Sequence, residues 1–235
     1  MAVQRSSHEY RKPKIAIIDD EDDDGQIPEW EIEAAGFVPF YIEQHFQNLE
    51  ELAEFIKAEA VGAVCTHRLS NYGFSDFYGA KLVASLYDLK VPALLITRYA
   101  DIDKHVSIRK WRTKVPVLLS LDEVNAQSIK RGMGKCVAEL KGEVPSSRKP
   151  YRTLLAITNI STVANERVVD AVIPGWNPRI AVRFPVSLIP AEFHELLAPD
   201  VAFFAQINIG AEKADDLYFR DFELAPEPDD NDGLA

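Results

Sequence analysis

The stretch KIAIID, residues 14–19, is a short run of apolar and partly β-branched residues that stops at acidic residues. Such a run is typical of a buried parallel strand that ends at a loop. The next segment, IPEWEIEAAGF, places apolar residues at near-helical spacing and ends with Gly36 as its cap, and VPFYIE, residues 38–43, follows as a second apolar run. The beginning of the chain therefore predicts strand, helix, strand.

The same alternation continues to residue 141. Further apolar runs resemble buried strands and are separated by segments with helical spacing. Five strands alternating with five helices predict an α/β fold with a doubly wound, five-stranded parallel sheet of the flavodoxin type. In such a sheet, sites lie at the carboxyl ends of the strands. The later strands are expected at residues 61–66, 91–97 and 115–120, and the later helices at 49–59, 79–89, 101–112 and 126–142.

A polar segment separates this part from the rest of the chain. GEVPSSRKPY, residues 142–151, contains proline, glycine, serine and charged residues but few apolar ones, which is typical of a linker. Beyond it, short runs with alternating polarity, such as RIAVRFPVSLIP, predict a small all-β barrel or sandwich. The predicted parts are a flexible N-terminus (1–11), an α/β domain (12–141), a linker (142–150), a β domain (151–225) and a disordered acidic tail (226–235).

The composition narrows the class of partner. A net charge of −11 over 235 residues disfavours nucleic acid and anionic lipid, so protein or small-molecule partners are favoured. Cys65 and Cys136 have no spacing that indicates a zinc site or a disulfide framework, which fits a reducing compartment. The first residues lack a signal-peptide pattern, and no apolar run is long enough to span a bilayer. We therefore expect a soluble, cytoplasmic protein with no membrane contact.

An acidic cluster follows the first predicted strand. IIDDEDDDG places Asp19 and Asp20 at the carboxyl end of that strand, with four more acidic residues after them. One interpretation is a solvated acidic loop. The other is a Mg²⁺ site, because Mg²⁺ binds one or two carboxylates plus water and phosphate, and such groups converge at strand ends. Mg²⁺ is the only cofactor that the sequence suggests.

With this cluster in place, residues 12–141 resemble the receiver (CheY-like) domain of bacterial two-component response regulators. In that family an acidic pair ends the first strand and binds Mg²⁺, and an aspartate that ends the third strand accepts a phosphoryl group. Asp19 and Asp20 match the acidic pair. In THRLSNYGFSDFYGAKLVASL, aligning Arg-Leu with the family's loop places Thr66 at the acceptor position and Gly79 at the start of the next helix.

The resemblance also covers the last two strands. A Thr or Ser ends the fourth strand of receivers, and Thr97 in ALLITRYAD matches this switch hydroxyl. A lysine ends the fifth strand, but VPVLLSLDEV has Ser120 or Leu119 at that place. Two chemical positions therefore depart from the family, and the resemblance implies a degenerate pseudo-receiver. Threonine is a poor nucleophile without a base, and loss of the lysine removes the cation that pairs with a phosphoryl oxygen.

Two alternatives keep some chemistry at this place. His67 follows Thr66 and is a second candidate phosphoacceptor, although successive strand residues face opposite sides, which favours a surface or core histidine. The other alternative is that Asp19, Asp20 and Thr66 still hold Mg²⁺ or a small anion.

The segment SIRKWRTK, residues 107–114, suggests an interface. Arg109, Lys110 and Arg112 surround Trp111, and Trp and Arg are enriched at protein interfaces. We therefore expect a basic rim around an exposed Trp111 that binds a protein partner or a second copy of the chain. A solvated basic face with Trp111 in the core is an equal alternative, and DNA contact is a weaker third.

These features predict a non-enzymatic signalling or adaptor protein. Its pseudo-receiver domain would mediate protein–protein interaction without phosphorylation, and a bacterial stress or defence system is a further hypothesis for its setting. The alternative is a Mg²⁺-dependent response regulator that is phosphorylated at an atypical acceptor and uses the β domain as output. A DNA-binding regulator is disfavoured by the acidic charge and by the lack of a helix-turn-helix pattern.

Overall fold

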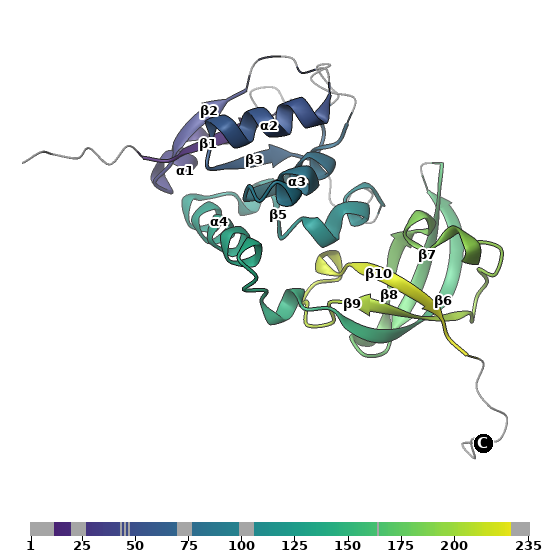
Figure 1. Ribbon diagram of the computed structural model, residues 1–235. Coiled ribbons are helices and arrows are strands. Elements are labelled where there is room, and N and C mark those ends of the chain that lie inside the picture. The colour runs from purple at the N-terminus through teal and green to yellow at the C-terminus, as the bar shows by residue number, and fades with distance from the viewer. Residues whose placement is uncertain are drawn as a thin grey trace, which may run out of the picture. The chain divides into compact units, whose positions relative to one another are not determined.

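The computed structural model describes residues 12–19, 27–42, 44, 46, 48–69, 77–98, 106–163 and 165–226 (Figure 1). The chain divides into two compact units. The first comprises Met1–Ile96 and Leu119–Val137, and the second comprises Thr97–Leu118 and Ala138–Ala235. The second unit therefore combines residues 97–118, from the middle of the chain, with the C-terminal part.

The N-terminal sheet is parallel and five-stranded. Its strands follow the order β2-β1-β3-β4-β5, which is the doubly wound order of flavodoxin-like folds. The predicted α/β fold class is thus confirmed. The residues of the three central strands, β1, β3 and β4, are almost all buried, as expected for strands that are covered on both faces. The strands are β1 Lys14–Ile18, β2 Val38–Tyr41, β3 Gly62–Thr66, β4 Ala93–Thr97 and β5 Val117–Ser120.

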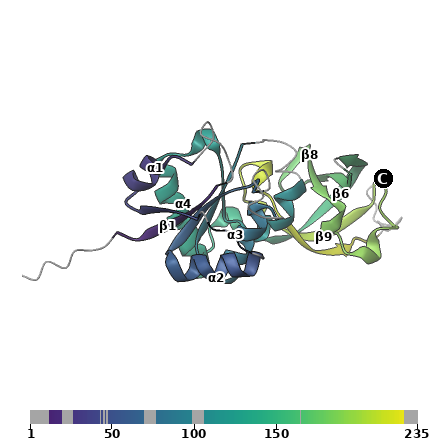
Figure 2. The same cartoon turned by 90° about the horizontal axis from the view of Figure 1, so that it is seen from above.

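Helices cover both faces of this sheet. Right-handed crossovers place the helix between β1 and β2 opposite the helices that follow β2 and β3, because the chain reverses direction along the sheet. Figure 2 accordingly shows α1 on one side and α2 on the other. The amide of Ala126 donates to the Glu31 carboxylate, which joins α1 to the first turn of α4. The helices are α1 Glu29–Ala34, α2 Leu49–Glu59, α3 Gly79–Asp88 and α4 Ala126–Leu140.

The connection between β4 and β5 differs from the expected helix. The sequence predicted an α-helix over residues 101–112, of which residues 101–105 lie outside the described part. The described remainder contains a 3-10 helix, η2 Arg109–Lys114. This tighter helix turns its side chains in other directions than an α-helix would, which matters for the arginines described below.

The C-terminal sheet is antiparallel and has the order β10-β9-β6-β7-β8. Three consecutive strands, β6, β7 and β8, pair as neighbours, and β9 returns beside β6, which is a Greek key. The hairpin partner β10 extends the sheet beyond β9. These strands are β6 Tyr151–Val163, β7 Glu166–Ile173, β8 Asn177–Pro185, β9 Ala202–Ile207 and β10 Phe219–Leu224.

This sheet curls around a single core. The ring of Phe184 on β8 stacks on that of Phe219 on β10, with centroids 4.4 Å apart, and lies 5.9 Å from that of Phe222. β8 and β10 are the two edges of the sheet, so their side chains can meet only if the sheet bends round. Among the described strands these edges are not hydrogen-bonded to each other. The predicted all-β domain is therefore confirmed, as one curled antiparallel sheet.

Three helix ends share one backbone motif. After α1, Gly36 takes a positive φ of 97°, and the amide of Phe37 donates to the carbonyl of Ile32, which is a Schellman ending. Gly142 closes α4 in the same way, with φ of 91°. α3 uses Lys90, at φ of 63°, with the amide of Val91 bonded to the carbonyl of Leu86. A side chain at this position is strained, because the left-handed region crowds the Cβ atom.

We expect Lys90→Gly to stabilise the protein by about 0.5–1 kcal/mol, because glycine adopts the left-handed conformation without the Cβ clash. Chemical denaturation of both proteins measures this difference. Gly36→Lys is the matched control and should destabilise, because it introduces the same strain at α1. An unchanged or lower free energy of unfolding for Lys90→Gly would contradict the assignment of strain to this residue.

Candidate functional site

Asp19 follows β1 at the carboxyl edge of the parallel sheet. Its Oδ2 accepts a hydrogen bond from the amide of Ile27 at 2.8 Å, and the hydroxyl of Tyr41 donates to the carbonyl of Ile27 at 3.2 Å. The pKa of Tyr41 is raised, mainly by burial and then by the charges of Glu29 and Asp19. Asp19 thus holds the residue Ile27, just before α1, against the end of β1, and it places negative charge at this edge.

The second member of the acidic pair lies outside the described residues. Asp20 and residues 21–24 belong to that part, so only Asp19 of the predicted Mg²⁺ pair is placed. Within the described ranges, no three His, Cys, Asp or Glu side chains come together to hold a metal ion. The Mg²⁺ site therefore remains a prediction.

Thr66 lies beside this edge, where the resemblance to receivers places the phosphoacceptor. It ends β3 and is only 3% exposed. Its hydroxyl lies 3.4 Å from the carbonyl oxygen of Ile18 and donates to it. Because β1 and β3 are paired with Ile18 opposite Cys65, the carboxyl ends of the two strands meet, and Asp19 and Thr66 come to the same edge. The hydroxyl is directed to the main chain rather than to a base that would activate it.

Gly79 begins α3 directly against the end of β3. Its amide donates to the carbonyl of His67 at 2.8 Å. A Cβ atom on this residue would lie 1.9 Å from the carbonyl oxygen of Thr66 and 2.8 Å from the Sγ atom of Cys65. Only glycine therefore fits here, which gives a packing reason for the helix-starting glycine expected from the sequence.

His67 is enclosed by the same elements. It is 2% exposed, and its ring stacks on that of Tyr78 with centroids 5.1 Å apart. Its amide donates to the carbonyl of Ile96 in the neighbouring strand β4. These contacts agree with the alternative of a buried histidine and place its ring away from solvent.

Cys65 is a second potential nucleophile at this edge, and it is fully buried. Its Sγ donates to the carbonyl of Thr66 at 3.2 Å. Burial raises the pKa of the Cys65 thiol well above its usual range, and the nearby charge of Asp19 raises it further. The thiol is therefore neutral at physiological pH and does not supply a nucleophile.

The other two positions of the receiver pattern lie at the ends of β4 and β5. Thr97 is the last residue of β4 and is buried, as a switch hydroxyl at a strand end would be. Ser120 ends β5, and its amide donates to the Glu123 carboxylate at 3.0 Å. Ser120 thereby begins the short 3-10 helix η3 Leu121–Glu123. At the place of the receiver lysine, the chain thus has a half-buried residue that starts a turn.

The predicted basic rim around Trp111 requires a correction. Arg109 is 1% exposed and Arg112 is 2% exposed, so neither forms part of a solvent-facing rim. Lys110 remains half-exposed and pairs with Glu166 at 2.6 Å, and Trp111 is half-buried. The segment is basic as expected, but the partners of Arg109, Lys110 and Arg112 lie within the chain.

Arg109 and Arg112 bind the connection between β9 and β10 within the second unit. Arg109 Nη1 donates to the carbonyls of Ala214, at 2.7 Å, and Leu217, at 2.6 Å. Arg112 Nη2 donates to Oδ1 of Asp216 at 2.6 Å. Burial lowers the pKa of Arg109 to about 10 and also lowers the pKa of Arg112, and the charge of Asp216 partly opposes both shifts. Arg109 therefore stays charged at neutral pH.

A third buried arginine lies in the segment predicted to be a linker. Arg148, in the 3-10 helix η4 Ser146–Arg148, forms a two-pronged ion pair with Glu139 at 3.0 and 2.9 Å. Its guanidinium also donates to the carbonyls of Arg112 and Thr113, both at 2.9 Å. Two-pronged pairs of this kind are short, directional and strong.

Asn208 completes this set of buried polar contacts. It is fully buried at the end of β9, and its Nδ2 donates to the carbonyls of Ser147 at 2.9 Å and Asp216 at 3.0 Å. Its Oδ1 accepts from the amide of Tyr218 at 2.7 Å, and the Tyr218 hydroxyl donates to the carbonyl of Arg148 at 2.6 Å. In the sequence, a polar residue directly after an apolar strand is the only signal of this role.

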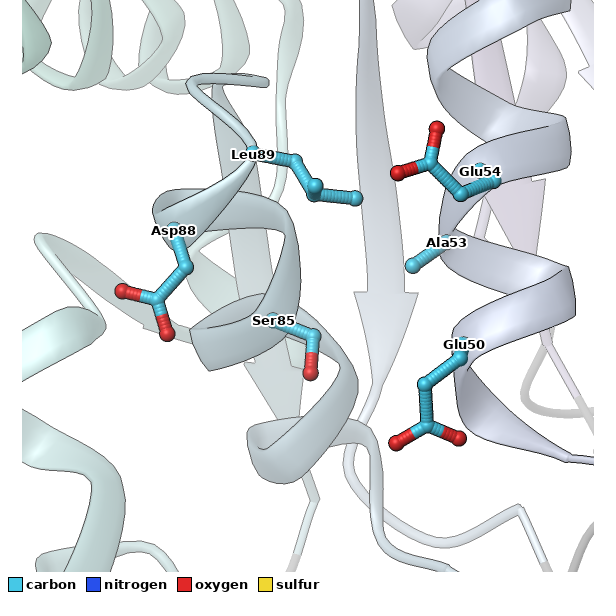
Figure 3. Close-up of a pocket in the computed structure, with 6 residues that line it drawn as sticks. All are labelled: Glu50, Ala53, Glu54, Ser85, Asp88 and Leu89. Carbon is cyan, nitrogen blue, oxygen red and sulfur yellow. The ribbon is translucent and has the colours of Figure 1, made fainter.

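The first unit also has a shallow hollow between α2 and α3. It has a volume of about 200 Å³ and three carboxylates in its lining. Figure 3 shows Glu50 and Glu54 on α2, with Asp88 on α3 directed away from α2. Glu54 also pairs with Lys57 at 3.4 Å. The groove is therefore acidic and faces solvent. Its lining residues are Glu50, Ala53, Glu54, Ser85, Asp88 and Leu89.

No protein-family model matches the sequence, and no curated protein matches it. Solved structures with a similar fold are receiver domains and response regulators. A receiver-domain protein from Clostridium thermocellum is 15% identical over 55% of this chain and 97% of its own, with a TM-score of 0.40. The receiver domain of an HD domain-containing protein from Pseudomonas fluorescens is 13% identical over 57% and 92%, with a TM-score of 0.39. A response regulator from Burkholderia pseudomallei is 20% identical over 56% and 72%, with a TM-score of 0.39.

The strand order by itself is that of the CheY-like fold. The receiver-like fold expected for the N-terminal part is therefore confirmed, and its degenerate character remains a prediction. In the described part of the chain, no helix is long and apolar enough to cross a membrane.

Gly79→Ala should lower the free energy of unfolding by about 1–3 kcal/mol or more, because the new methyl group overlaps the carbonyl of Thr66 and the backbone must shift. Gly134→Ala is the matched control. Gly134 lies inside α4 with no atom within 4 Å of a Cβ position, so alanine should stabilise by about 0.5–1 kcal/mol. Urea denaturation of both variants measures these changes, and equal effects would contradict the close approach at Gly79.

Native Cys65 should not react with a thiol reagent such as DTNB at pH 8, because its raised pKa keeps the thiol neutral and burial blocks access. In the Cys136→Ser variant, any reaction reports Cys65 alone. For this variant we expect no fast phase of reaction under native conditions and one reactive thiol per chain in denaturant. A fast native phase in this variant would contradict the neutral, buried thiol.

The buried pair Arg148–Glu139 should be far more sensitive to single substitution than an exposed pair. Arg148→Met should destabilise by about 3–5 kcal/mol, because it leaves the Glu139 charge buried without its partner. Arg148→Met combined with Glu139→Leu should recover part of this loss. The exposed pair Arg152–Glu223, at 51% and 58% exposure, is the control, and Arg152→Met should change stability by about 0–1 kcal/mol. Similar losses for both single variants would contradict the burial argument.

Proposed function

We propose that this chain is a non-catalytic signalling or adaptor protein whose receiver-like part acts without phosphorylation. The contact between the Thr66 hydroxyl and the Ile18 carbonyl carries this proposal. The position that would hold the acceptor carboxylate instead holds a buried hydroxyl that is bonded to the main chain. A phosphoryl group needs an accessible, activated nucleophile, and this hydroxyl has neither property.

The end of β5 supports the same interpretation. A phosphorylated receiver needs a cation near the phosphoryl oxygens, and the corresponding place holds Ser120 or Leu119. The amide of Ser120 donates to the Glu123 carboxylate at 3.0 Å, which places a negative charge beside it. His67 and Cys65, the other candidates near Thr66, are both buried.

The function is then binding, with the antiparallel sheet as the output part. A protein partner or a second copy of the chain fits the net charge of −11 better than nucleic acid does. Because Arg109 and Arg112 are buried, the partner surface lies elsewhere than on a basic rim around Trp111. A bacterial stress or defence system remains the working hypothesis for its setting.

Incubation of the whole chain with a small phosphodonor and Mg²⁺ tests the proposal. We expect no mass increase, while a receiver domain with an intact acceptor aspartate gains one phosphate in the same reaction. A stoichiometric increase in this chain would instead favour the alternative, a Mg²⁺-dependent response regulator with an atypical acceptor. Asp20→Ala should then abolish the increase, and Thr66→Val and His67→Gln would identify the acceptor.

A further inference from the structure

Two segments of the second unit are joined through buried arginines. The first is residues 106–118, which lead from β4 to β5, and the second is the β9–β10 connection, residues 208–218. Arg109 donates to the carbonyls of Ala214 and Leu217, and Arg112 Nε donates to the carbonyl of Asp215, so main-chain groups of the connection accept these bonds. The backbone path of one segment therefore determines where the other can lie, whatever side chains the connection carries.

The third arginine joins both segments to η4. Arg148 donates to the carbonyls of Arg112 and Thr113 in the first segment. In turn, its own carbonyl accepts from the hydroxyl of Tyr218, and its guanidinium lies 5.1 Å from the Tyr218 ring centroid. Asn208 adds a bond to the carbonyl of Ser147. Each of the three stretches, 106–118, 146–148 and 208–218, thus contacts the other two.

Such a set of contacts is expected to form or break as a whole. A buried guanidinium that loses one partner is left with unsatisfied N–H groups and an uncompensated charge. Movement of residues 106–118 would expose all three arginines to that penalty, and movement of the β9–β10 connection would expose Arg109 and Arg112. Local opening of a structure occurs in cooperative units of this kind, and coupling between two places on a protein is reciprocal.

We propose that residues 106–118 and the β9–β10 connection are one coupled element, through which a conformational change in the segment after β4 is passed to the antiparallel sheet. The coupled element deepens the proposed function, because it is a path inside the chain by which the receiver-like part could act on the antiparallel sheet. Only the biological meaning of the coupling rests on the proposed function. The coupling itself requires neither phosphoryl transfer nor an external partner.

Hydrogen exchange of the full chain, read by mass spectrometry, tests the coupling in both directions. Arg112→Lys keeps the charge but loses the planar fork, and it should accelerate exchange in residues 208–218 by about tenfold or more. Asp216→Asn, changed in the other segment, should accelerate exchange in residues 106–118. Asp216 is 39% exposed at its side chain, so this variant keeps the experiment informative if Arg112→Lys fails to fold.

Two controls separate coupling from simple loss of stability. Lys110→Met removes the half-exposed ion pair with Glu166 from the same segment and should leave residues 208–218 unchanged. Phe222→Leu weakens the core of the antiparallel sheet beside Phe184 and should accelerate exchange in β8 and β10 without a selective increase in residues 106–118.

Reciprocal acceleration in Arg112→Lys and Asp216→Asn, absent from both controls, would establish the coupled element. Acceleration confined to the mutated segment would overturn it. Phosphoryl labelling of the chain would reject the proposed function while leaving these exchange results intact, so the two failures are distinguishable.

Discussion

The second unit depends on the need to satisfy three buried guanidinium groups. A guanidinium carries a permanent charge and five N–H donors, and it can leave water only where carbonyls and carboxylates take over both. Arg109, Arg112 and Arg148 all donate to main-chain carbonyls, and Arg112 and Arg148 also pair with Asp216 and Glu139. Because the acceptors come from stretches far apart in sequence, satisfying the arginines also fixes how those stretches pack.

The carboxyl edge of the parallel sheet follows a different constraint. There the close approach of α3 to β3 requires Gly79, and it leaves little room around Thr66, His67 and Cys65. Polar groups in this space bond to neighbouring carbonyls, and the thiol stays neutral. In its described part this edge is therefore a well-packed junction.

The antiparallel sheet protects its β8 edge with prolines. β8, an edge of the antiparallel sheet, contains Pro178 and Pro185, which cannot donate to a further strand. The curl of the sheet brings Phe184 and Phe219 together, so the core is closed by side chains even where the edges are not paired. These features disfavour the addition of an extra strand along β8 and direct the search for a partner surface to other faces.

The sequence by itself determined the α/β and all-β parts and the approximate positions of their strands, because strand burial and turn chemistry act over a few neighbouring residues. The match of Thr66, Thr97 and Ser120 to a receiver pattern rests on the resemblance to that family. Only the tertiary structure decided the fate of the basic segment SIRKWRTK. Local pattern reasoning treats charge as a sign of exposure, and it predicted a solvent-facing rim. Arg109 and Arg112 are buried because their acceptors, more than a hundred residues later, are carbonyls and a carboxylate that no local pattern reveals. The buried contacts of Asn208 are hidden from the sequence for the same reason: its partners are main-chain groups, which carry no signature in the sequence and are brought together only by the fold.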